Sequence, residues 1–235
     1  MALSPMMKYY LEVKEKYKDA ILMFRLGDFY EMFFEDAKLC SEVLDLTLTG
    51  RDCGLEERAP MCGVPYHAVD GYISKLIGAG YKVAICEQLS APQARGLVER
   101  DVVRVITPGT VIEDDILDDK KNNYLACLVM SEKEFSLAWV DVSTGEFNVM
   151  QSEYGDFAAI EDMLTTVAPA EIIANEFAVE KVRELPDMRK SRFAPVQRYH
   201  DWIFTESNGA AAMKKQFGVD NLQKYEFGAQ KLCYQ

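Results

Sequence analysis

The sequence predicts an α/β protein of two domains, each organised around a mixed β-sheet. Its 235 residues leave room for two ordinary domains, each large enough to bury a core. Strand-like and helix-like hydrophobic patterns recur in both halves of the chain, and an acidic, polar stretch separates them. We therefore expect a first domain at 1–112, an acidic linker at 113–123 and a second domain at 124–235.

A β-hairpin is predicted near the start of the chain. An apolar run precedes the turn pair Gly27-Asp28, and a segment rich in aromatic residues follows it. Because side chains alternate along a strand, Phe29 and Glu31 would share one face, with Tyr30 and Met32 on the other. An apolar ring and a carboxylate would then project side by side from the tip of the hairpin.

Pattern alone favours a different interpretation of Phe29, in which it is a core residue. Apolar residues continue from it at helical spacing, and most aromatic residues in such a pattern are buried. These residues are Phe33, Ala37, Cys40 and Leu44.

The rest of the first domain is predicted to alternate helices and strands. Ser4 suits an N-cap and Pro5 suits the first helical position, so a helix should run from there to about Lys18. The further predictions are a helix at 35–44, a strand at 46–49, a loop at 50–59, a turn-rich apolar segment at 60–67, a helix at 68–77, and strands at 83–86 and 102–107.

The second domain is predicted to start with a three-stranded meander and to continue with alternating helices and strands. This order is similar to the ribonuclease H arrangement. The chain stops at Gln235 in a poorly patterned segment, and we expect it to be cut there rather than finished. The predicted strands are 124–130, 135–142, 146–150, 171–174 and 196–203, and the predicted helices are 157–167, 177–185 and 210–217.

The charge balance limits which part of the chain can meet DNA. The formal net charge of -12 argues against a protein that coats nucleic acid, whose surface should be basic. The first 110 residues carry 13 Lys and Arg against 16 Asp and Glu, and the remainder carries 13 against 22. Only the first half is therefore neutral enough for a local basic face. Arg95, Arg100 and Arg104 suit a solvated face at least as well as a phosphate contact.

No targeting or membrane segment is expected. No apolar run approaches the length of a membrane span, and residues 1–10 lack the basic and apolar regions of a signal peptide. The composition, 49% hydrophobic and 27% charged, is that of an ordinary globular protein. We expect a cytoplasmic protein with no membrane partner.

The sequence offers no catalytic, metal or cofactor motif. The six cysteines are scattered and are expected to be reduced. Cys53, Cys62 and His67 lack the usual spacing of zinc ligands. The phosphate-binding G-x-x-x-x-G-K-[ST] loop, G-x-G-x-x-G, H-E-x-x-H and G-x-S-x-G are all absent.

One enzymatic alternative stays open, a metal-dependent nuclease of the ribonuclease H type centred on Asp141. Such an enzyme needs several converging carboxylates, which would come from Asp156, Glu161 or Asp162. The favoured interpretation is that Asp141 caps the turn at 143–145. A protein-interaction module without a role on DNA is a further alternative.

Four motifs in one order carry a resemblance to a known family. They are GDFYE at 27–31, PMCGVPYHA at 60–68, VAICEQ at 83–88, and the segment from VER at 98–100 to VITPGT at 105–110. In this combination the chain resembles the bacterial MutS DNA mismatch-repair proteins.

The resemblance implies that the first domain binds mismatched double-stranded DNA and that the second is a ribonuclease H-like connector domain. Phe29 would stack on a mispaired base from the minor groove, and Glu31 would hydrogen-bond that base. We add Tyr30, Arg51 and Met61 as candidate DNA-binding residues flanking it. No catalytic residue is expected in this part of the protein.

The resemblance also implies a longer protein, of which this chain is the N-terminal part. That protein is an ATPase that uses ATP and Mg, forms a homodimer and meets a MutL-type repair partner through the connector domain.

Glu31 raises a question of charge. When ionised it only accepts hydrogen bonds, so it suits an N–H donor, and facing a ring-nitrogen acceptor it must carry a proton. We therefore hypothesise that it senses mispairs partly by protonation.

Overall fold

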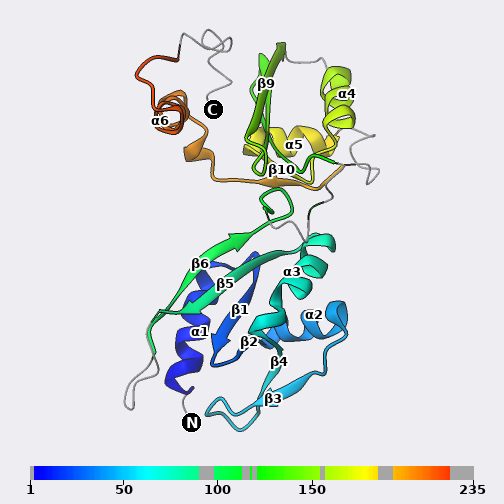
Figure 1. Ribbon diagram of the computed structural model, residues 1–235. Helices are drawn as coiled ribbons and strands as arrows, with labels where there is room; N and C mark the ends of the chain where they lie inside the picture. The colour runs from blue at the N-terminus through cyan, green and yellow to red at the C-terminus, as the bar shows by residue number, and fades with distance from the viewer. Residues whose placement is uncertain are drawn as a thin grey trace. The chain divides into compact units, whose positions relative to one another are not determined.

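The protein divides into two compact units. The computed structural model describes residues 3–89, 98–112, 117, 121–153, 157–184 and 193–222. The first unit extends to Pro108, and the second is formed by Gly109–Ile112 and the residues from Leu117 onward (Figure 1). Most of the predicted linker at 113–123 lies outside the described residues, as does Arg95.

The first unit is built on a six-stranded mixed sheet in the order β3-β4-β2-β1-β5-β6. Only the β1–β5 pair is parallel; the other neighbours in this sheet are antiparallel. The strands are β1 (Ala20–Leu26), β2 (Phe29–Phe33), β3 (Thr49–Arg51), β4 (Ala59–Pro65), β5 (Lys82–Gln88) and β6 (Arg100–Ile106). The helices are α1 (Pro5–Lys16), α2 (Phe34–Leu44), the short 3-10 helix η1 (Tyr66–Ala68) and α3 (Val69–Gly78).

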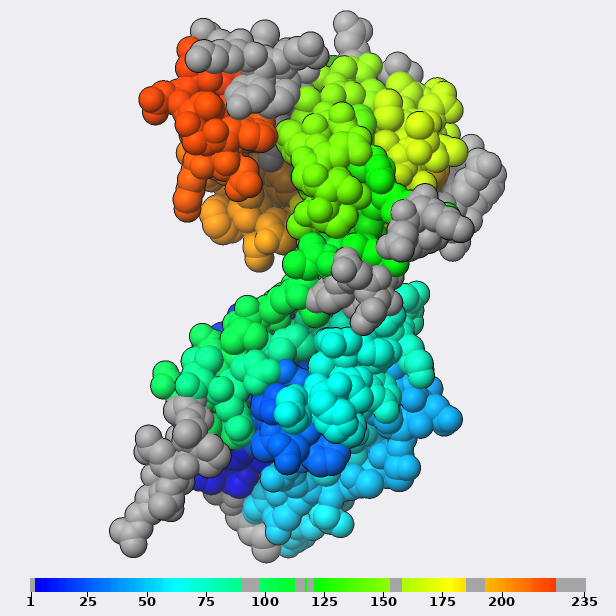
Figure 2. All heavy atoms as spheres, in the orientation of Figure 1, coloured from blue at the N-terminus to red at the C-terminus, as the bar shows by residue number. Residues whose placement is uncertain are grey.

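Helices cover both faces of this sheet. The buried side chains of α1 pack against alternate residues of β1, including Leu22 and Phe24. Helices α2 and α3 pack against β4 and β5 from the other face, as the ribbon also shows (Figure 1). In the space-filling view, residues of β3, β4 and α3 in cyan adjoin the blue N-terminal strands on one surface of this unit (Figure 2).

The hairpin prediction is confirmed. Strands β1 and β2 pair antiparallel with Leu26 opposite Phe29, and Gly27 has φ +61, a conformation that glycine adopts without strain. Tyr30 and Met32 are buried on one face, whereas Phe29 is 47% exposed on the other. The interpretation of Phe29 as a core residue is therefore wrong.

Two predictions around β4 are wrong. The segment at 60–67 is largely a strand rather than a turn-rich connection, and the short strand lies at Thr49–Arg51 rather than 46–49. Strand β4 pairs with β2 on one side and β3 on the other. This pairing is non-local, and it overrides the turn signals of the prolines and glycine in the segment.

The second unit is built on a five-stranded mixed sheet in the order β11-β10-β7-β8-β9. The predicted antiparallel meander is confirmed, and β10 and β11 add to it in parallel. The strands are β7 (Tyr124–Met130), β8 (Glu134–Asp141), β9 (Glu146–Glu153), β10 (Glu171–Ala174) and β11 (Val196–Arg198). The helices are α4 (Phe157–Val167), α5 (Glu176–Glu184), the 3-10 helix η2 (Asp201–Ile203) and α6 (Glu206–Phe217).

The core of the second unit lies between this sheet and helices α4 and α5. Leu128, Leu137, Ile160 and Leu164 are fully buried in it. The predicted strand at 196–203 is too long, because η2 replaces its second half. No helix in the described part of the chain is long and apolar enough to cross a membrane.

Candidate nucleic-acid interface

Phe29 is an exposed aromatic side chain at the start of β2. It lies opposite Leu26 on one neighbouring strand and Pro65 on the other. The turn before it is fixed to the end of β4, because the Tyr66 N–H donates to the Asp28 carbonyl oxygen at 2.9 Å. Phe29 has its backbone between two neighbouring strands and is 47% exposed, so it can present its apolar ring to a binding partner.

Glu31 follows on the same face, two positions further into the sheet. It lies opposite Phe24 on β1 and Gly63 on β4. Its carboxylate forms an ion pair with the Arg51 guanidinium from β3. The Glu31 side chain is 14% exposed and that of Arg51 is 37% exposed, so the pair stays accessible from solvent.

Gly63 provides the space in which the Glu31 side chain lies. A Cβ at this position would be 3.2 Å from the Tyr30 carbonyl oxygen and 3.4 Å from the Glu31 Cγ. Sequence reasoning did not single out Gly63, although the register of β4 on β2 makes it the direct neighbour of Glu31.

Met61 lies on β4, between β2 and β3. It is opposite Phe33 on β2 and Thr49 on β3, and its side chain packs against the core beneath α1. The Thr49 hydroxyl donates to the Met61 carbonyl oxygen at 3.0 Å. Of the five predicted DNA-binding residues, the structure thus gathers Phe29, Glu31, Arg51 and Met61 on neighbouring strands.

Tyr30 is the member of this set that the structure separates from the others. Its ring is buried at 4% exposure, and its hydroxyl donates to the Glu87 carboxylate. Burial, followed by this hydrogen bond, raises the pKa of Tyr30 to about 12. The Arg25 guanidinium lies 5.4 Å from the Tyr30 ring centre and 3.9 Å from that of Tyr66. Tyr30 therefore braces the hairpin from behind.

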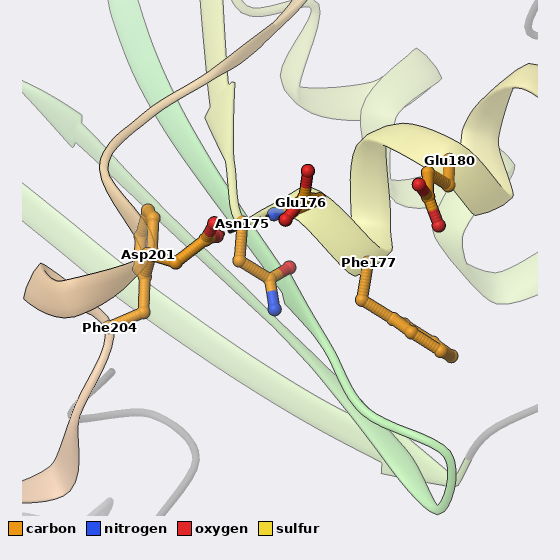
Figure 3. Close-up of a pocket in the computed structure, with 6 residues that line it drawn as sticks. All are labelled: Asn175, Glu176, Phe177, Glu180, Asp201 and Phe204. Carbon is orange, nitrogen blue, oxygen red and sulfur yellow. Dashed lines mark hydrogen bonds between the residues drawn. The ribbon is translucent and has the colours of Figure 1, made fainter.

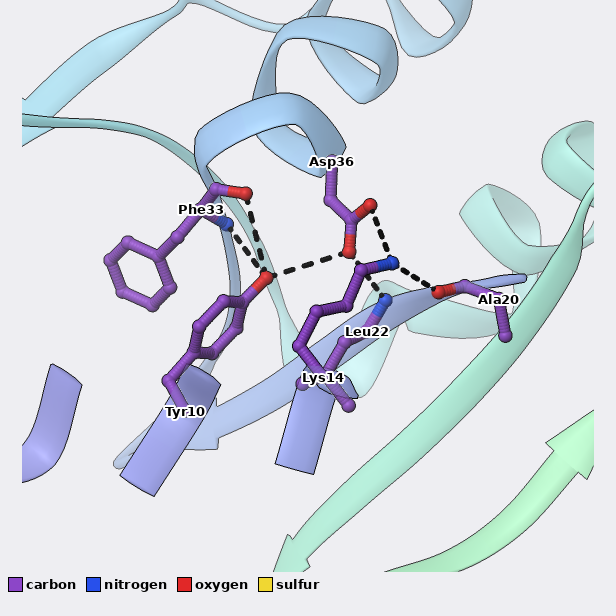
Figure 4. Close-up of polar contacts among 6 residues, drawn as sticks. All are labelled: Tyr10, Lys14, Ala20, Leu22, Phe33 and Asp36. Carbon is purple, nitrogen blue, oxygen red and sulfur yellow. Dashed lines mark hydrogen bonds and ion pairs between the residues drawn. The ribbon is translucent and has the colours of Figure 1, made fainter. Parts of the chain in front are cut away.

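A polar network anchors the other end of β2 (Figure 4). Asp36 accepts hydrogen bonds from the Leu22 N–H at 3.0 Å and from the Lys14 ammonium at 2.9 Å. The Tyr10 hydroxyl contacts both Asp36 and the backbone of Phe33. Burial raises the pKa of Tyr10, and the nearby carboxylate raises it further. The network ties α1, β1 and α2 together at the end of the strand that carries Phe29.

Arg100 departs from the prediction of a solvated face, because it is only 7% exposed. Its guanidinium lies 5.2 Å from the Phe24 ring centre and donates to the carbonyl oxygens of Arg25 and Val98, each at 2.9 Å. Burial lowers the pKa of Arg100. Since Phe24 is the neighbour of Glu31, this buried cation lies on the face of the sheet that presents the carboxylate.

Comparison with known proteins assigns the chain to a family. The family model described as MutS domain I matches residues 4–115, and that of MutS domain II matches residues 123–235. The chain belongs to the MutS family. The MutS match covers both structural units, and it includes the hairpin with Phe29 and Glu31.

Individual MutS relatives match between 74% and 98% of the chain. "DNA mismatch repair protein MutS" of Alkaliphilus oremlandii is 46% identical over 98% of this chain and 27% of its own length. The MutS of Clostridium botulinum strain 657 is 55% identical over 96% of this chain and 24% of its own length. That of Acetivibrio thermocellus is 56% identical over 74% of this chain and 20% of its own length. The chain thus spans about a quarter of these MutS relatives.

The turn after β8 decides the role of Asp141 in this MutS chain. Its Oδ1 accepts from the Ser143 N–H at 2.9 Å and the Ser143 hydroxyl at 2.6 Å, and its Oδ2 accepts from the Asn123 N–H at 3.1 Å. Burial alone would raise the pKa of Asp141, but these hydrogen bonds and one from Thr144 lower it overall. The preferred interpretation as a turn cap is confirmed.

The nuclease alternative gains no support from the described residues of the MutS chain. Among them, no cluster of three or more His, Cys, Asp or Glu side chains is arranged to hold a metal ion. Both oxygens of Asp141 already accept hydrogen bonds, Oδ1 from the turn and Oδ2 from the Asn123 N–H before β7, and Asp156 lies outside the described residues.

A pocket of about 520 Å³ lies in the second MutS domain between α5 and η2 (Figure 3). Arg198 bridges two of its carboxylates, with ion pairs to Glu176 at 2.6 Å and Asp201 at 2.7 Å. The Asn175 side chain has a structural role. Its oxygen accepts a hydrogen bond from the Met130 N–H at 3.1 Å, and its nitrogen donates one to the Met130 carbonyl oxygen at 2.9 Å. The remaining lining residues are Phe177, Glu180 and Phe204.

Proposed function

We propose that this chain recognises mispaired or unpaired bases in double-stranded DNA to initiate mismatch repair. Phe29 enters the duplex from the minor groove as a wedge, and Glu31 hydrogen-bonds the mispaired base. The observation that carries the proposal is the exposed Phe29 ring beside the Glu31 carboxylate on one face of β2. Membership in the MutS family, whose relatives are named as mismatch-repair proteins, supports it.

The physical basis is the difference in stacking and pairing between matched and mispaired steps. A side chain wedged from the minor groove unstacks a base step and kinks the duplex. That step costs less at a mispair, where pairing is already compromised. Stacking on an aromatic ring contributes roughly 1–3 kcal/mol regardless of base identity. One phenylalanine therefore serves many mismatches, and discrimination comes mainly from the deformability of the DNA.

Glu31 supplies the directional contact. Paired with a guanidinium, the carboxylate is an acceptor, so it suits an N–H group on the displaced base. Contact with a ring-nitrogen acceptor would need a protonated Glu31. We propose that Glu31 carries a proton when it contacts a base of this kind.

The proposal extends to the complete protein. There it acts as a homodimer in the cytoplasm, and the second domain, as the connector, contacts a MutL-type repair partner. ATP and Mg do not fit this chain, which has no phosphate-binding loop motif. We assign their binding to a part of the complete protein outside these residues.

Replacing Phe29 by alanine in the complete protein tests the proposal. Loss of the stacked ring should lower the preference for a G·T heteroduplex over homoduplex by about tenfold to hundredfold. The measurement is a competition binding titration with both duplexes at one salt concentration.

Leu55→Ala is the matched control, because Leu55 is 45% exposed in the loop between β3 and β4. This variant should keep the parent preference. If Phe29→Ala also kept it, the wedge assignment would be wrong.

A further inference from the structure

The Arg51 side chain reaches Glu31 across an intervening strand. Arg51 lies opposite Ala59 on β4, whereas Glu31 lies opposite Gly63 on the other edge of the same strand. The guanidinium therefore spans β4 and runs along it to meet the carboxylate. Such a contact uses the full length of an arginine and fixes both side chains over one surface.

The surface between the two residues is shaped for this contact. Gly63 contributes no side chain beside Glu31, and a Cβ there would lie close to the Tyr30 carbonyl oxygen, at 3.2 Å, and would touch the Glu31 Cγ at 3.4 Å. Strand β3 is short and at the edge of the sheet, so Arg51 is approachable from solvent. Pairing with Arg51 holds the Glu31 carboxylate on the same face as Phe29.

The ion pair between Arg51 and Glu31 reduces the electrostatic cost of placing a carboxylate near DNA. A lone carboxylate beside a mispaired base would be repelled by the phosphates of both strands. A carboxylate paired with a guanidinium brings no net charge, and it keeps a free lone pair to accept from the base. Buried Arg100, on the same face, adds positive potential.

We propose that Arg51 is the positioning residue of the mismatch site. It holds the Glu31 carboxylate beside Phe29 and cancels its charge against the DNA backbone. This inference rests on the proposed function. It gives Arg51 a role different from direct contact with a DNA phosphate. A phosphate contact would act independently of Glu31, whereas a positioning residue acts only through it.

A double-mutant cycle on the complete protein separates the two roles. Arg51→Met should lower the preference for G·T heteroduplex over homoduplex by about tenfold when Glu31 is present, as expected for directly contacting charged groups. In a Glu31→Gln background, the same Arg51 substitution should change the preference by less than about threefold. Equal losses in both backgrounds, or no loss in either, would overturn the proposal.

Two further variants exclude a general effect of charge or folding. Arg51→Lys keeps the charge and should recover part of the preference, because lysine can pair with the carboxylate but lacks the planar fork. Arg58→Met removes an exposed positive charge from the neighbouring loop. Its effect on preference should be the same in the parent and in the Glu31→Gln background, and a dependence like that of Arg51 would contradict the proposal.

The outcome is distinguishable from failure of the proposed function. If Phe29→Ala loses the mismatch preference while the Arg51 and Glu31 effects are additive, only the role of Arg51 is wrong. If Phe29→Ala keeps the preference, the mismatch site itself is wrong.

Discussion

Asp36 is a nearly buried carboxylate that holds three segments of the first unit together. It is 8% exposed, and it accepts from a backbone N–H of β1 as well as from the ammonium of Lys14 on α1. Without it the Leu22 N–H would lose its Asp36 acceptor, and the Lys14 ammonium would keep only the Ala20 carbonyl oxygen at 2.7 Å. A buried donor without a partner costs more free energy than a satisfied hydrogen bond contributes. Loss of the Asp36 carboxylate should therefore lower the stability of the first unit considerably.

Asp36→Ala should therefore lower the free energy of unfolding of the first unit by about 2–4 kcal/mol. Denaturant titration of the chain, followed by signals from the first unit, measures the change. Glu35→Ala is the control on the same helix, since its ion pair with Lys38 is exposed and should contribute less than about 1 kcal/mol. Similar losses in the two variants would contradict the structural role of Asp36.

Among elements, the β8–β9 hairpin depends on one side chain for its turn. Gly145 is the last residue of the turn and has φ +77, and its N–H donates to the Asp141 carbonyl oxygen at 2.8 Å. The Asp141 carboxylate closes the same turn through Ser143 and Thr144. These donors favour the ionised form, which links the stability of the meander to pH.

Asp141→Asn should destabilise the second unit by about 1–3 kcal/mol at neutral pH, because charge-assisted hydrogen bonds become neutral ones. The folded-state pKa of Asp141 lies below the ordinary value of 3.8. Its contribution is therefore present above pH 3.8 and is lost as the pH falls through the folded-state pKa. Parent and variant should approach each other in unfolding free energy as the pH falls from 3.8 through the folded-state pKa, and a gap independent of pH would refute this account.

Elements defined by local signals were predictable from the sequence, and elements defined by distant pairing were not. The Gly27-Asp28 turn and the β7–β8–β9 meander follow from short-range patterns. The ion pair between Arg51 and Glu31 depends on the strand order β3-β4-β2, which no local pattern specifies. The exposure of Phe29 was predicted only through the family resemblance, because its apolar spacing alone favours burial.

At the scale of the whole chain, each unit has its own sheet and core, so a substitution in one need not affect the other. The second unit is tightly packed around Gly109. A Cβ there would lie 2.9 Å from the Glu171 Cβ and 3.0 Å from the Leu125 Cα. Gly71 in α3 of the first unit has open space around the same position.

Alanine at these two glycines should have opposite effects in the two units. Gly109→Ala should destabilise the second unit by about 1–3 kcal/mol through overpacking. Gly71→Ala should stabilise the first by about 0.4–1 kcal/mol by restricting the unfolded chain. Hydrogen exchange of amides in β10 and β1 reports on each unit separately, and a response of both strands to either substitution would argue against independent units.

The alternation of faces along β2 also constrains how this chain can change length. Because Leu26 is paired with Phe29 across a two-residue turn, one residue inserted into or deleted from β2 itself would exchange the two faces beyond that point. Tyr30 would then lie on the face where Phe29 is exposed, and Glu31 would take the buried face of Tyr30 and Met32. The loop between β3 and β4 has no alternating faces, so a change in its length would not exchange buried and exposed side chains. Length variation among descendants of this sequence should therefore accumulate in the loop, and the hairpin should vary by substitution alone.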